Sequence, residues 1–374
     1  MVNIAFTGGG TGGHIYPGLA VAACLKGMGD FRVFWIGSSS GMDRSIVEKA
    51  GMEFHGVPSG RLRRYFSLKT VPDMFRVAAG FFAARSLLKK QRPALLFSKG
   101  GFVSVPPCAA AASLGIPVFT HESDFSPGLA TRLNLRFVAR NGGRIFTAYA
   151  ETASSFPPAY QGLVRVSGNP VRPEFRNARA EKGRAFLGLG AGERVLLVLG
   201  GSQGARELNN LVREALAELT KLFVVVHQTG AGYEPASRER YLPYPYFGEE
   251  LPHVLAAASL VLCRAGAGTV YENAVLGRAM ILAPLRGSGT RGDQVENARF
   301  FEKSGAALVL PEDPKAETLL EAVSALAADP EKLGAMAAAA ARIGKTDGAA
   351  FIARAIAEAA GGAPDRAGQG GGRL

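Results

Sequence analysis

The chain has 374 residues, of which 47% are hydrophobic and 20% charged, and its formal net charge at pH 7 is +12. This length suits two α/β domains, and the balance of apolar and charged residues excludes a disordered chain except at the C-terminal end. No apolar run reaches the about 18 residues that a membrane-spanning helix needs, so we expect any membrane contact to be peripheral.

The positive charge calls for an acidic partner, which could be nucleic acid, an anionic membrane surface or a phosphorylated substrate. Zinc-finger spacing, RNP-like strands and a helix-turn-helix signature are lacking, so we expect no nucleic acid. The cysteines Cys24, Cys108 and Cys263 are far apart and lack CxxC spacing, which indicates buried thiols in a reducing compartment. The N-terminus begins with an apolar strand rather than a signal-peptide pattern, so we expect a chain that is not exported.

Short apolar strands alternate with helical patterns along the first half of the chain. We expect strands at 2–7, 31–36, 94–98 and 117–120, and helices at 17–28, 43–50 and 105–113. Such alternation predicts a parallel sheet with helices on both faces, and ligands bind such sheets beyond the carboxyl ends of the strands.

The second half repeats this pattern, with strands expected at 194–199, 223–227, 260–264, 280–284 and 307–310. Gly168 and Asn169-Pro170 lie between the halves and favour a hinge. The prediction is therefore an α/β protein of two Rossmann-like, doubly wound parallel-sheet domains facing a cleft. The domains are expected at residues 1–165 and 166–345, with alanine-rich helix over 324–360 and disorder over 361–374.

The first strand runs into a glycine-rich turn from Gly8 to Gly13, and the first strand of the second half runs into another at 200–205. Each turn precedes a helical pattern and offers backbone amides to a phosphate, although tight packing alone also favours glycine. The first turn matches a dinucleotide fingerprint, but the second strand ends in Gly37-Ser38-Ser39 without the acidic residue that binds a ribose. Arg44 leaves an NADP-binding variant open.

Polar residues follow two later strands. Residues 264–272 place small residues before Glu272, whose carboxylate can accept two vicinal hydroxyls of a ribose or can cap a helix. Asp293 and Gln294 follow the next strand and can bind sugar hydroxyls. His14, directly after the first glycine turn, is either a proton acceptor, a substrate contact or a structural histidine.

Taken in order, these motifs resemble the MurG family of bacterial N-acetylglucosaminyltransferases, which convert lipid I to lipid II in peptidoglycan synthesis. The matching segments are 9–17, 99–104, 121–122, 168–172, 200–205, 227–230 and 264–269, within residues 3 to 345. The resemblance implies a GT-B fold in which a final helix, about 346–360, packs back on the first domain. It also implies that UDP-GlcNAc binds the second domain and that the first domain receives the acceptor.

The resemblance also implies site residues. The nucleobase would meet backbone at Phe247-Gly248, Glu272 would bind the ribose, and Asp293 with Gln294 would bind the GlcNAc hydroxyls. The full donor set is Thr11, Gly12, Gly13, Asp124, Arg172, Ser202, Gly248, Ala267, Gly268, Thr269, Val270, Tyr271, Glu272, Asp293 and Gln294. The acceptor diphosphate is expected at Gly10, Lys99, Gly100 and Gly101.

Two positions depart from the family pattern. Ser123-Asp124 stands where Gln-Asn is common, and Asp293 stands where many members have glutamine. A carboxylate accepts hydrogen bonds from sugar hydroxyls but cannot donate one, so donor selectivity depends on this position.

We expect an inverting displacement in which His14, or as second choice Glu122, takes the proton of the attacking hydroxyl. Helix amides and Arg172 would stabilise the leaving diphosphate, so no metal or other cofactor is expected.

The segment 61–90 combines cations with apolar and aromatic residues. This pattern favours peripheral docking on the cytoplasmic face of the bacterial membrane, although an ordinary helix that covers the sheet is the alternative. The expected membrane patch is Arg63, Arg64, Lys69, Met74, Phe75, Phe81 and Phe82. Two other functions stay open: a transferase that uses a UDP-sugar on a soluble acceptor, and a non-catalytic module that binds a nucleotide sugar or NADP.

Overall fold

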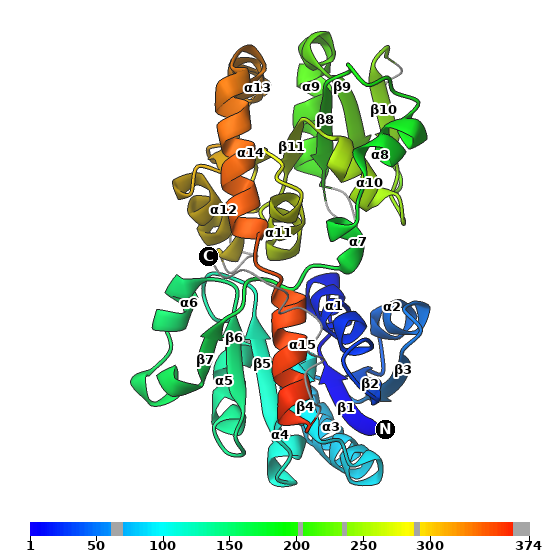
Figure 1. Ribbon diagram of the computed structural model, residues 1–374, viewed down its shortest axis with the longest axis vertical. Coiled ribbons are helices and arrows are strands. Elements are labelled where there is room, and N and C mark those ends of the chain that lie inside the picture. Colours follow the sequence, from blue (N-terminus) through cyan, green and yellow to red (C-terminus); the bar gives the residue numbers. More distant parts are fainter. Residues whose placement is uncertain (61–69, 201–204, 234–237, 288–291, 362–374) are drawn as a thin grey trace, which may run out of the picture. The chain divides into compact units, whose positions relative to one another are not determined.

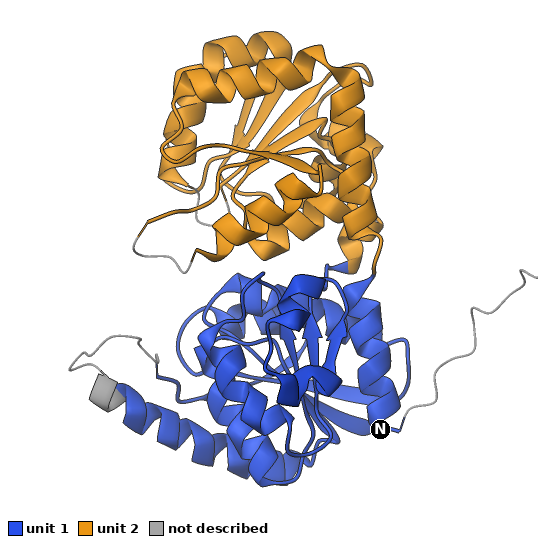
Figure 2. Ribbon diagram, turned by 90° about the vertical axis from the view of Figure 1, so that its left-hand side faces the viewer, with its two compact units in different colours: residues 1–172, 347–374 blue, residues 173–346 orange. Residues whose placement is uncertain are grey.

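The computed structural model describes residues 1–60, 70–200, 205–233, 238–287 and 292–361, with side chains from residue 73 onward in the helix that begins at Thr70. These residues divide into two compact units, Met1–Arg172 with Asp347 onward, and Pro173–Thr346 (Figure 2). Each unit is a parallel sheet covered by helices (Figure 1), so the predicted fold class is confirmed.

Unit 1 contains a seven-stranded sheet in the order β3-β2-β1-β4-β5-β6-β7, with every pair parallel. Its strands are β1 (Val2–Thr7), β2 (Phe31–Ser38), β3 (Glu53–Val57), β4 (Leu95–Ser98), β5 (Val118–Glu122), β6 (Arg144–Thr147) and β7 (Val164–Val166). Its helices are α1 (Tyr16–Leu25), α2 (Asp43–Lys49), α3 (Thr70–Gln91), α4 (Val105–Ser113), α5 (Leu129–Val138), α6 (Ala150–Ser154) and α15 (Gly348–Ala359), with 3-10 turns at Gly12–His14, Phe102–Ser104 and Pro158–Leu163.

Alternate residues of β1 face opposite sides of this sheet, as the pleat requires. Ile4 and Phe6 join one core cluster with α1 and α15, and Ala5 joins another with α3, α4 and α5. In α15, Ile352 and Ile356 are fully buried. At about 1.5–3 kcal/mol for each large apolar side chain, this burial ties the end of the chain to unit 1.

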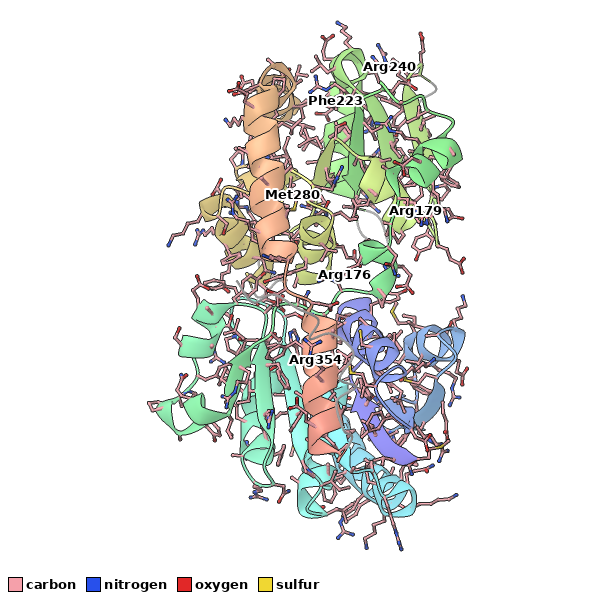
Figure 3. The ribbon with its side chains drawn as sticks, in the orientation of Figure 1. Arg176, Arg179, Phe223, Arg240, Met280 and Arg354 are labelled. Atoms are coloured by element: carbon pink, nitrogen blue, oxygen red, sulfur yellow. The ribbon has the colours of Figure 1, made fainter. Side chains whose placement is uncertain are left out.

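Unit 2 contains a six-stranded parallel sheet in the order β10-β9-β8-β11-β12-β13. Its strands are β8 (Val195–Leu199), β9 (Val224–Gln228), β10 (Tyr241–Tyr244), β11 (Leu260–Cys263), β12 (Met280–Leu282) and β13 (Ala307–Val309). Its helices are α7 (Pro173–Arg176), α8 (Ala180–Leu187), α9 (Arg206–Leu222), α10 (Leu251–Ala257), α11 (Ala267–Val275), α12 (Asp293–Lys303), α13 (Ala316–Ala328) and α14 (Pro330–Gly344). Phe223 and Met280, labelled in Figure 3, are fully buried: Phe223 directly precedes β9, and Met280 is the first residue of β12.

The structure places the division between the units at Arg172–Pro173, whereas the sequence placed it at 165–166. Residues after the end of β7 at Val166 stay with unit 1 because they contact it: Ser167 N donates to Thr147 O, and the Gly168 carbonyl oxygen lies 3.1 Å from His121 Nε2. On the other side of the division, Arg176 donates from Nη2 to the carbonyl oxygens of Gly344 and Thr346 (Figure 3).

The alanine-rich stretch over 324–360, which was predicted to be helical, is divided into separate helices. It consists of the end of α13, then α14 and α15. Asp329 separates the first two because its side chain caps α14 by accepting from Lys332 N, and Pro330 begins the new helix. Asp347 caps α15 in the same way by accepting from Ala350 N.

Candidate active site

The turn after β1 is held by contacts within unit 1. The carbonyl oxygen of Gly8 accepts from Trp35 Nε1 at 3.0 Å. The Asp43 carboxylate, 1% exposed, accepts from Gly10 N and from Ser38 N, both at 3.0 Å. The sequence predicted bare amides in this turn, but the Gly10 amide is bound to Asp43 and is not offered to a phosphate while that bond holds.

The sequence did not indicate a structural role for Asp43. Gly9 packs so closely on its carboxylate that a Cβ at position 9 would overlap the carboxylate oxygen. The signal was the first acidic residue after the end of the second strand, which in this chain binds the glycine turn instead of a ribose. Asp43 therefore fixes the shape of the turn that carries Thr11 and His14.

His14 ends the 3-10 turn Gly12–His14, and its Nδ1 lies 3.0 Å from Thr11 Oγ1. The imidazole lies against Gly101, whose φ is +77°: a Cβ built there would come within 3.2 Å of Nδ1 and 2.6 Å of the Gly9 carbonyl oxygen. Gly100 is also close to the ring, because a Cβ built there would lie 3.8 Å from Cδ2. The structure thus brings together Thr11, His14, Gly100 and Gly101, which the sequence had placed in one site.

Glu122, the second choice for the base, is buried at the end of β5. Its Oε2 accepts from Gly128 N at 2.9 Å and Thr131 Oγ1 at 2.6 Å, and its Oε1 accepts from Asp124 N at 3.2 Å. These three bonds fold the β5–α5 loop around the carboxylate. The contacts support a role for Glu122 in shaping this loop, and they place Asp124 within it.

Lys99 is only 2% exposed, and its Nζ donates to Ser123 Oγ at 2.8 Å. Ser123 in turn donates to Asn169 Oδ1 at 2.7 Å. Burial lowers the pKa of Lys99, and the Glu122 and Asp124 carboxylates oppose that shift. The ammonium group therefore links the ends of β4 and β5 to the segment that leaves unit 1, rather than lying at the surface for a ligand.

Arg172 also belongs to unit 1, where its guanidinium lies 4.9 Å from the centre of the Tyr16 ring. This cation–π contact places the side chain beside the start of α1. The expected donor residues from Gly248 to Gln294 belong to unit 2.

In unit 2, α11 begins at Ala267 after the N-cap Gly266. The first amides of a helix have no partner within the helix, which leaves Gly268 and Thr269 in the position where an anion is stabilised. Val270 N already donates to Gly266 O at 3.1 Å, so the predicted set of amides ends one residue earlier.

Glu272 and Tyr271 lie on different sides of α11. Glu272 is half-buried, and its carboxylate adds to the effect of burial in raising the pKa of the Cys263 thiol to about 12. Tyr271 is 4% exposed and packs edge-on against Phe301, with ring centroids 5.6 Å apart. The helix therefore directs Tyr271 into the core and leaves Glu272 partly accessible.

Asp293 and Gln294 form the first turn of α12 and are both partly exposed. Gln294 Oε1 accepts from Leu285 N at 2.9 Å, which orients its amide so that the NH2 group is the side presented to a ligand. Asn297, one turn further, donates to Ala265 O at 3.2 Å. The starts of α11 and α12 are thus held together, and the pair offers one carboxylate acceptor and one amide donor.

The loop that is predicted to contact the nucleobase is also held by hydrogen bonds within unit 2. Phe247 is 1% exposed, and its N donates to Gln228 Oε1 at 3.1 Å, while Gly248 N donates to Glu250 Oε2 at 3.1 Å. Gln228 lies in the segment 227–230 that carries part of the family resemblance, and the sequence did not indicate a role for its side chain. Its side chain fixes the loop that carries the backbone groups of Phe247 and Gly248.

Arg264 is a second positioning residue that the sequence did not assign. It donates to Ala283 O at 3.0 Å and forms an ion pair with Glu207 at 2.5 Å. These contacts join the ends of β11 and β12 to the first turn of α9.

Four predicted residues, Ser202, Arg63, Arg64 and Lys69, lie outside the described residues. Of the expected membrane patch, Met74, Phe75 and Phe82 on α3 are 61%, 74% and 68% exposed, whereas Phe81 is half-buried and packs on the core. Within the described ranges, no helix is both long and apolar enough to cross a bilayer. The same residues contain no group of three or more His, Cys, Asp or Glu side chains that could hold a metal ion.

Comparison with known proteins matches a family model to most of each unit. The chain matches the glycosyltransferase family 28 N-terminal domain over residues 4–142 and the C-terminal domain of the same family over residues 195–352. By structure it is similar to Acinetobacter baumannii MurG, with a TM-score of 0.73 and 24% identity over 96% of this chain and 100% of that one. It also resembles the calicheamicin glycosyltransferase CalG4, with a TM-score of 0.65 and 18% identity over 96% of this chain and 98% of that one. At these identities the likeness shows the fold.

Two curated relatives are much closer in sequence, and both are named UDP-N-acetylglucosamine–N-acetylmuramyl-(pentapeptide) pyrophosphoryl-undecaprenol N-acetylglucosamine transferase. The one from Treponema denticola is 49% identical over 332 residues, covering 83% of this chain and 84% of the relative. The one from Shouchella clausii is 42% identical over 330 residues, covering 87% and 91%. The resemblance predicted from the motifs is confirmed, and the chain belongs to the family of these glycosyltransferases, the MurG family.

Proposed function

We propose that this protein transfers N-acetylglucosamine from UDP-GlcNAc to the C4 hydroxyl of the lipid-linked N-acetylmuramoyl-pentapeptide, the step from lipid I to lipid II. The observation that carries the proposal is the 49% identity, over 83% of the chain, to a relative whose name states this transfer. The two half-sites fit it, because unit 2 offers groups for a nucleotide sugar and unit 1 offers a histidine beside a glycine turn.

The donor is proposed to bind unit 2. Helix amides at Gly268 and Thr269 suit a diphosphate, and the half-buried Glu272 carboxylate suits the ribose hydroxyls. Asp293 accepts from one sugar hydroxyl, and the Gln294 amide, oriented by Leu285 N, donates to a sugar oxygen. Together with the backbone at Phe247 and Gly248, these groups would contact the base, the ribose, the diphosphate and the sugar of the donor.

The chemical step is a direct displacement. The C4 oxygen of the muramoyl unit forms a bond to C1 of GlcNAc, and the bond from C1 to the UDP diphosphate breaks with its electron pair on UDP. His14 takes the hydroxyl proton and later passes it to solvent. Attack opposite the leaving group inverts the anomeric centre.

The leaving diphosphate is proposed to be stabilised by helix amides and Arg172, an electrostatic contribution that needs no metal ion. This part is tested by assay with excess chelator. We expect turnover to persist, and loss of turnover that one specific divalent ion restores would contradict the proposal.

The acceptor is anchored in a membrane, and we propose that α3 docks on an anionic leaflet. Its exposed Met74, Phe75 and Phe82 lie on a helix that also carries the exposed cations Arg76, Lys89 and Lys90. Apolar side chains next to cations favour an interfacial position, and each nearby cation contributes about 1 kcal/mol. Replacing Phe75 and Phe82 by serine should reduce co-sedimentation with anionic vesicles, with Phe351→Ser on α15 as the control for a partly exposed phenylalanine elsewhere.

The proposed transfer is tested with the purified full-length chain, labelled UDP-GlcNAc and lipid I. Formation of a labelled lipid product that is lost in His14→Gln supports it. A soluble muramoyl-peptide acceptor is tested in parallel, because the alternative function is transfer to a soluble acceptor. Equal turnover of the soluble acceptor, or no transfer to lipid I, would contradict the proposal.

A further inference from the structure

The turns after β1 and β4 pack against each other in unit 1 through backbone atoms. A Cβ added at Gly8, in the first turn, would lie 2.6 Å from the His14 carbonyl oxygen. A Cβ added at Gly101, in the second turn, would lie 2.6 Å from the Gly9 carbonyl oxygen. These distances leave no room for a side chain at either glycine. The position of the turn after β4 therefore constrains the turn that carries His14.

The imidazole of His14 takes part in the same contact. A Cβ built at Gly101 would lie 3.2 Å from Nδ1 and 3.3 Å from Cγ, and one built at Gly100 would lie 3.8 Å from Cδ2. Both glycines have positive φ, +86° at Gly100 and +77° at Gly101, which residues with a side chain rarely adopt. The backbone of Gly100-Gly101 is thus a surface on which the ring lies, and a shift of this backbone would release the ring.

Ser104 holds this backbone in place from the other end of the turn. Its Oγ donates to the Gly101 carbonyl oxygen at 2.8 Å, and its N donates to the same oxygen at 3.1 Å. The serine is fully buried. Because a carbonyl oxygen only accepts, the one hydroxyl proton of Ser104 is used in this bond, and a second bond at Oγ has to be one that Oγ accepts.

Asn134 on α5 supplies that second bond, since its Nδ2 donates to Ser104 Oγ at 3.1 Å. Asn134 is 0% exposed and lies on the buried face of α5 with Leu135 and Val138, where most helices carry apolar residues. Its Oδ1 is buried and has no hydrogen-bond partner among the described residues, which is unfavourable for stability. A leucine would avoid that cost, so stability alone does not account for an asparagine at this position.

We propose that Ser104 and Asn134 are positioning residues that hold the Gly100-Gly101 backbone against His14, so that the imidazole keeps one orientation toward the acceptor hydroxyl. The chain of donors runs from Asn134 to the Ser104 hydroxyl, and from that hydroxyl to the Gly101 carbonyl oxygen. The inference rests on the proposed function for the role of His14 as the base. The placement of the ring is a property of the protein without substrate, so it is tested separately.

The direct test is ¹H–¹³C correlation of the histidine rings in the full-length chain without substrate, with the His14 signals assigned as those lost in His14→Gln. Ser104→Ala removes the hydroxyl, and Asn134→Leu removes the amide in a residue of similar size. We expect both to shift the His14 ring signals, while the other four histidines keep theirs. Ser113→Ala is the matched control and should leave His14 unchanged, because Ser113 Oγ also donates at 2.8 Å to a carbonyl oxygen three residues earlier, that of Ala110.

Kinetics provide the second readout. Ser104→Ala and Asn134→Leu should each lower kcat by about two- to tenfold, the effect of one hydrogen bond on the orientation of the base, with an unchanged KM for UDP-GlcNAc. If the two residues act in one chain, the double variant should be no slower than Ser104→Ala alone, because removal of the hydroxyl already breaks the chain. Multiplied effects in the double variant would contradict the chain.

Unchanged His14 signals in Ser104→Ala and Asn134→Leu would overturn the inference, whatever the activity. Equal shifts in Ser113→Ala, or shifts of all five histidines, would also overturn it, since they would show a general effect on the fold. Shifted His14 signals in Ser104→Ala, together with a wild-type protein that fails to glycosylate lipid I, would instead refute the proposed function and leave the placement of the ring standing.

Discussion

The turn after β1 and the turn before α11 both follow strands of parallel sheets, one in each unit, yet their polar atoms have different partners. In unit 1, Asp43 and Trp35 bind the backbone of the turn, which leaves the Thr11 and His14 side chains as its chemical groups. In unit 2, the turn opens a nine-residue helix whose first amides have no helical partner. One turn therefore presents side chains, which we propose for proton transfer, and the other presents backbone dipoles, which we propose for donor binding.

Replacing His14 by glutamine is the strongest test of this difference in role between the two turns. If the unit 1 turn supplies the base, His14→Gln should lower kcat by about 100- to 10,000-fold, the usual contribution of a general base. The KM for UDP-GlcNAc should stay close to wild type, because His14 is not among the expected donor-binding residues. His55→Gln serves as the control for a histidine outside the site, and a His14→Gln enzyme with wild-type kcat would remove the catalytic half of the comparison.

Asp43→Asn tests whether the first turn needs its internal acceptor. Asparagine replaces one carboxylate oxygen by an NH2 group, so one of the two backbone N–H groups would face a donor instead of an acceptor. This change should lower the free energy of unfolding by about 1–3 kcal/mol. The melting temperature of unit 1 in the full chain measures this. Glu48→Gln on the same helix, in an exposed ion pair with Arg44, should change stability by less than about 0.5 kcal/mol. Equal effects of the two substitutions would show that the turn is not held by Asp43.

Glu272→Gln tests the binding role of the second turn. Loss of a charged acceptor for ribose hydroxyls should weaken UDP binding by about tenfold to 100-fold, with little change in kcat at saturating donor. Calorimetry with UDP and 2′-deoxy-UDP sharpens the experiment. The wild type should discriminate between them and the variant should not, so a variant that still prefers UDP would contradict the assignment.

The smallest expected effect is on donor choice. Asp293→Gln restores a donor group at the position where the carboxylate can only accept, and should change the ratio of kcat/KM for UDP-GlcNAc and UDP-glucose by about two- to tenfold, the worth of one hydrogen bond. Asp313→Gln, in the loop after β13, is the control. An unchanged ratio would mean that Asp293 does not contact the sugar.

Much of the fold could be predicted, because β8 and β11 are continuous apolar runs and β1 and β2 are mostly apolar, the pattern of strands in a buried parallel sheet. β3, β6, β7 and β10 were not predicted. β3 carries Glu53, His55 and Gly56 in five residues, and β10 includes Pro243, so their composition lacks the apolar run of a central strand, as suits strands at the sheet edges.

For the site, the sequence indicated which residues lie at the ends of the strands, but not which other residues of the chain they bind. The partners of Gly10 and of Lys99 lie 33 and 24 residues away in the chain, and only the sheet order brings them together. The same holds for Gln228 and Phe247, which are 19 residues apart. Burial of Lys99 was likewise missed, because a lysine next to two glycines has the pattern of an exposed phosphate-binding loop.

The place of α15 has a consequence for synthesis on the ribosome. Unit 2 is one contiguous segment, Pro173–Thr346, whereas unit 1 takes its last core helix from Gly348–Ala359. The second-made unit can therefore complete its core while the first-made one still lacks Ile352 and Ile356. Nascent chains that stop before this helix leave apolar sheet surface uncovered, which marks truncated products for chaperones and proteases rather than for release as half-working enzyme.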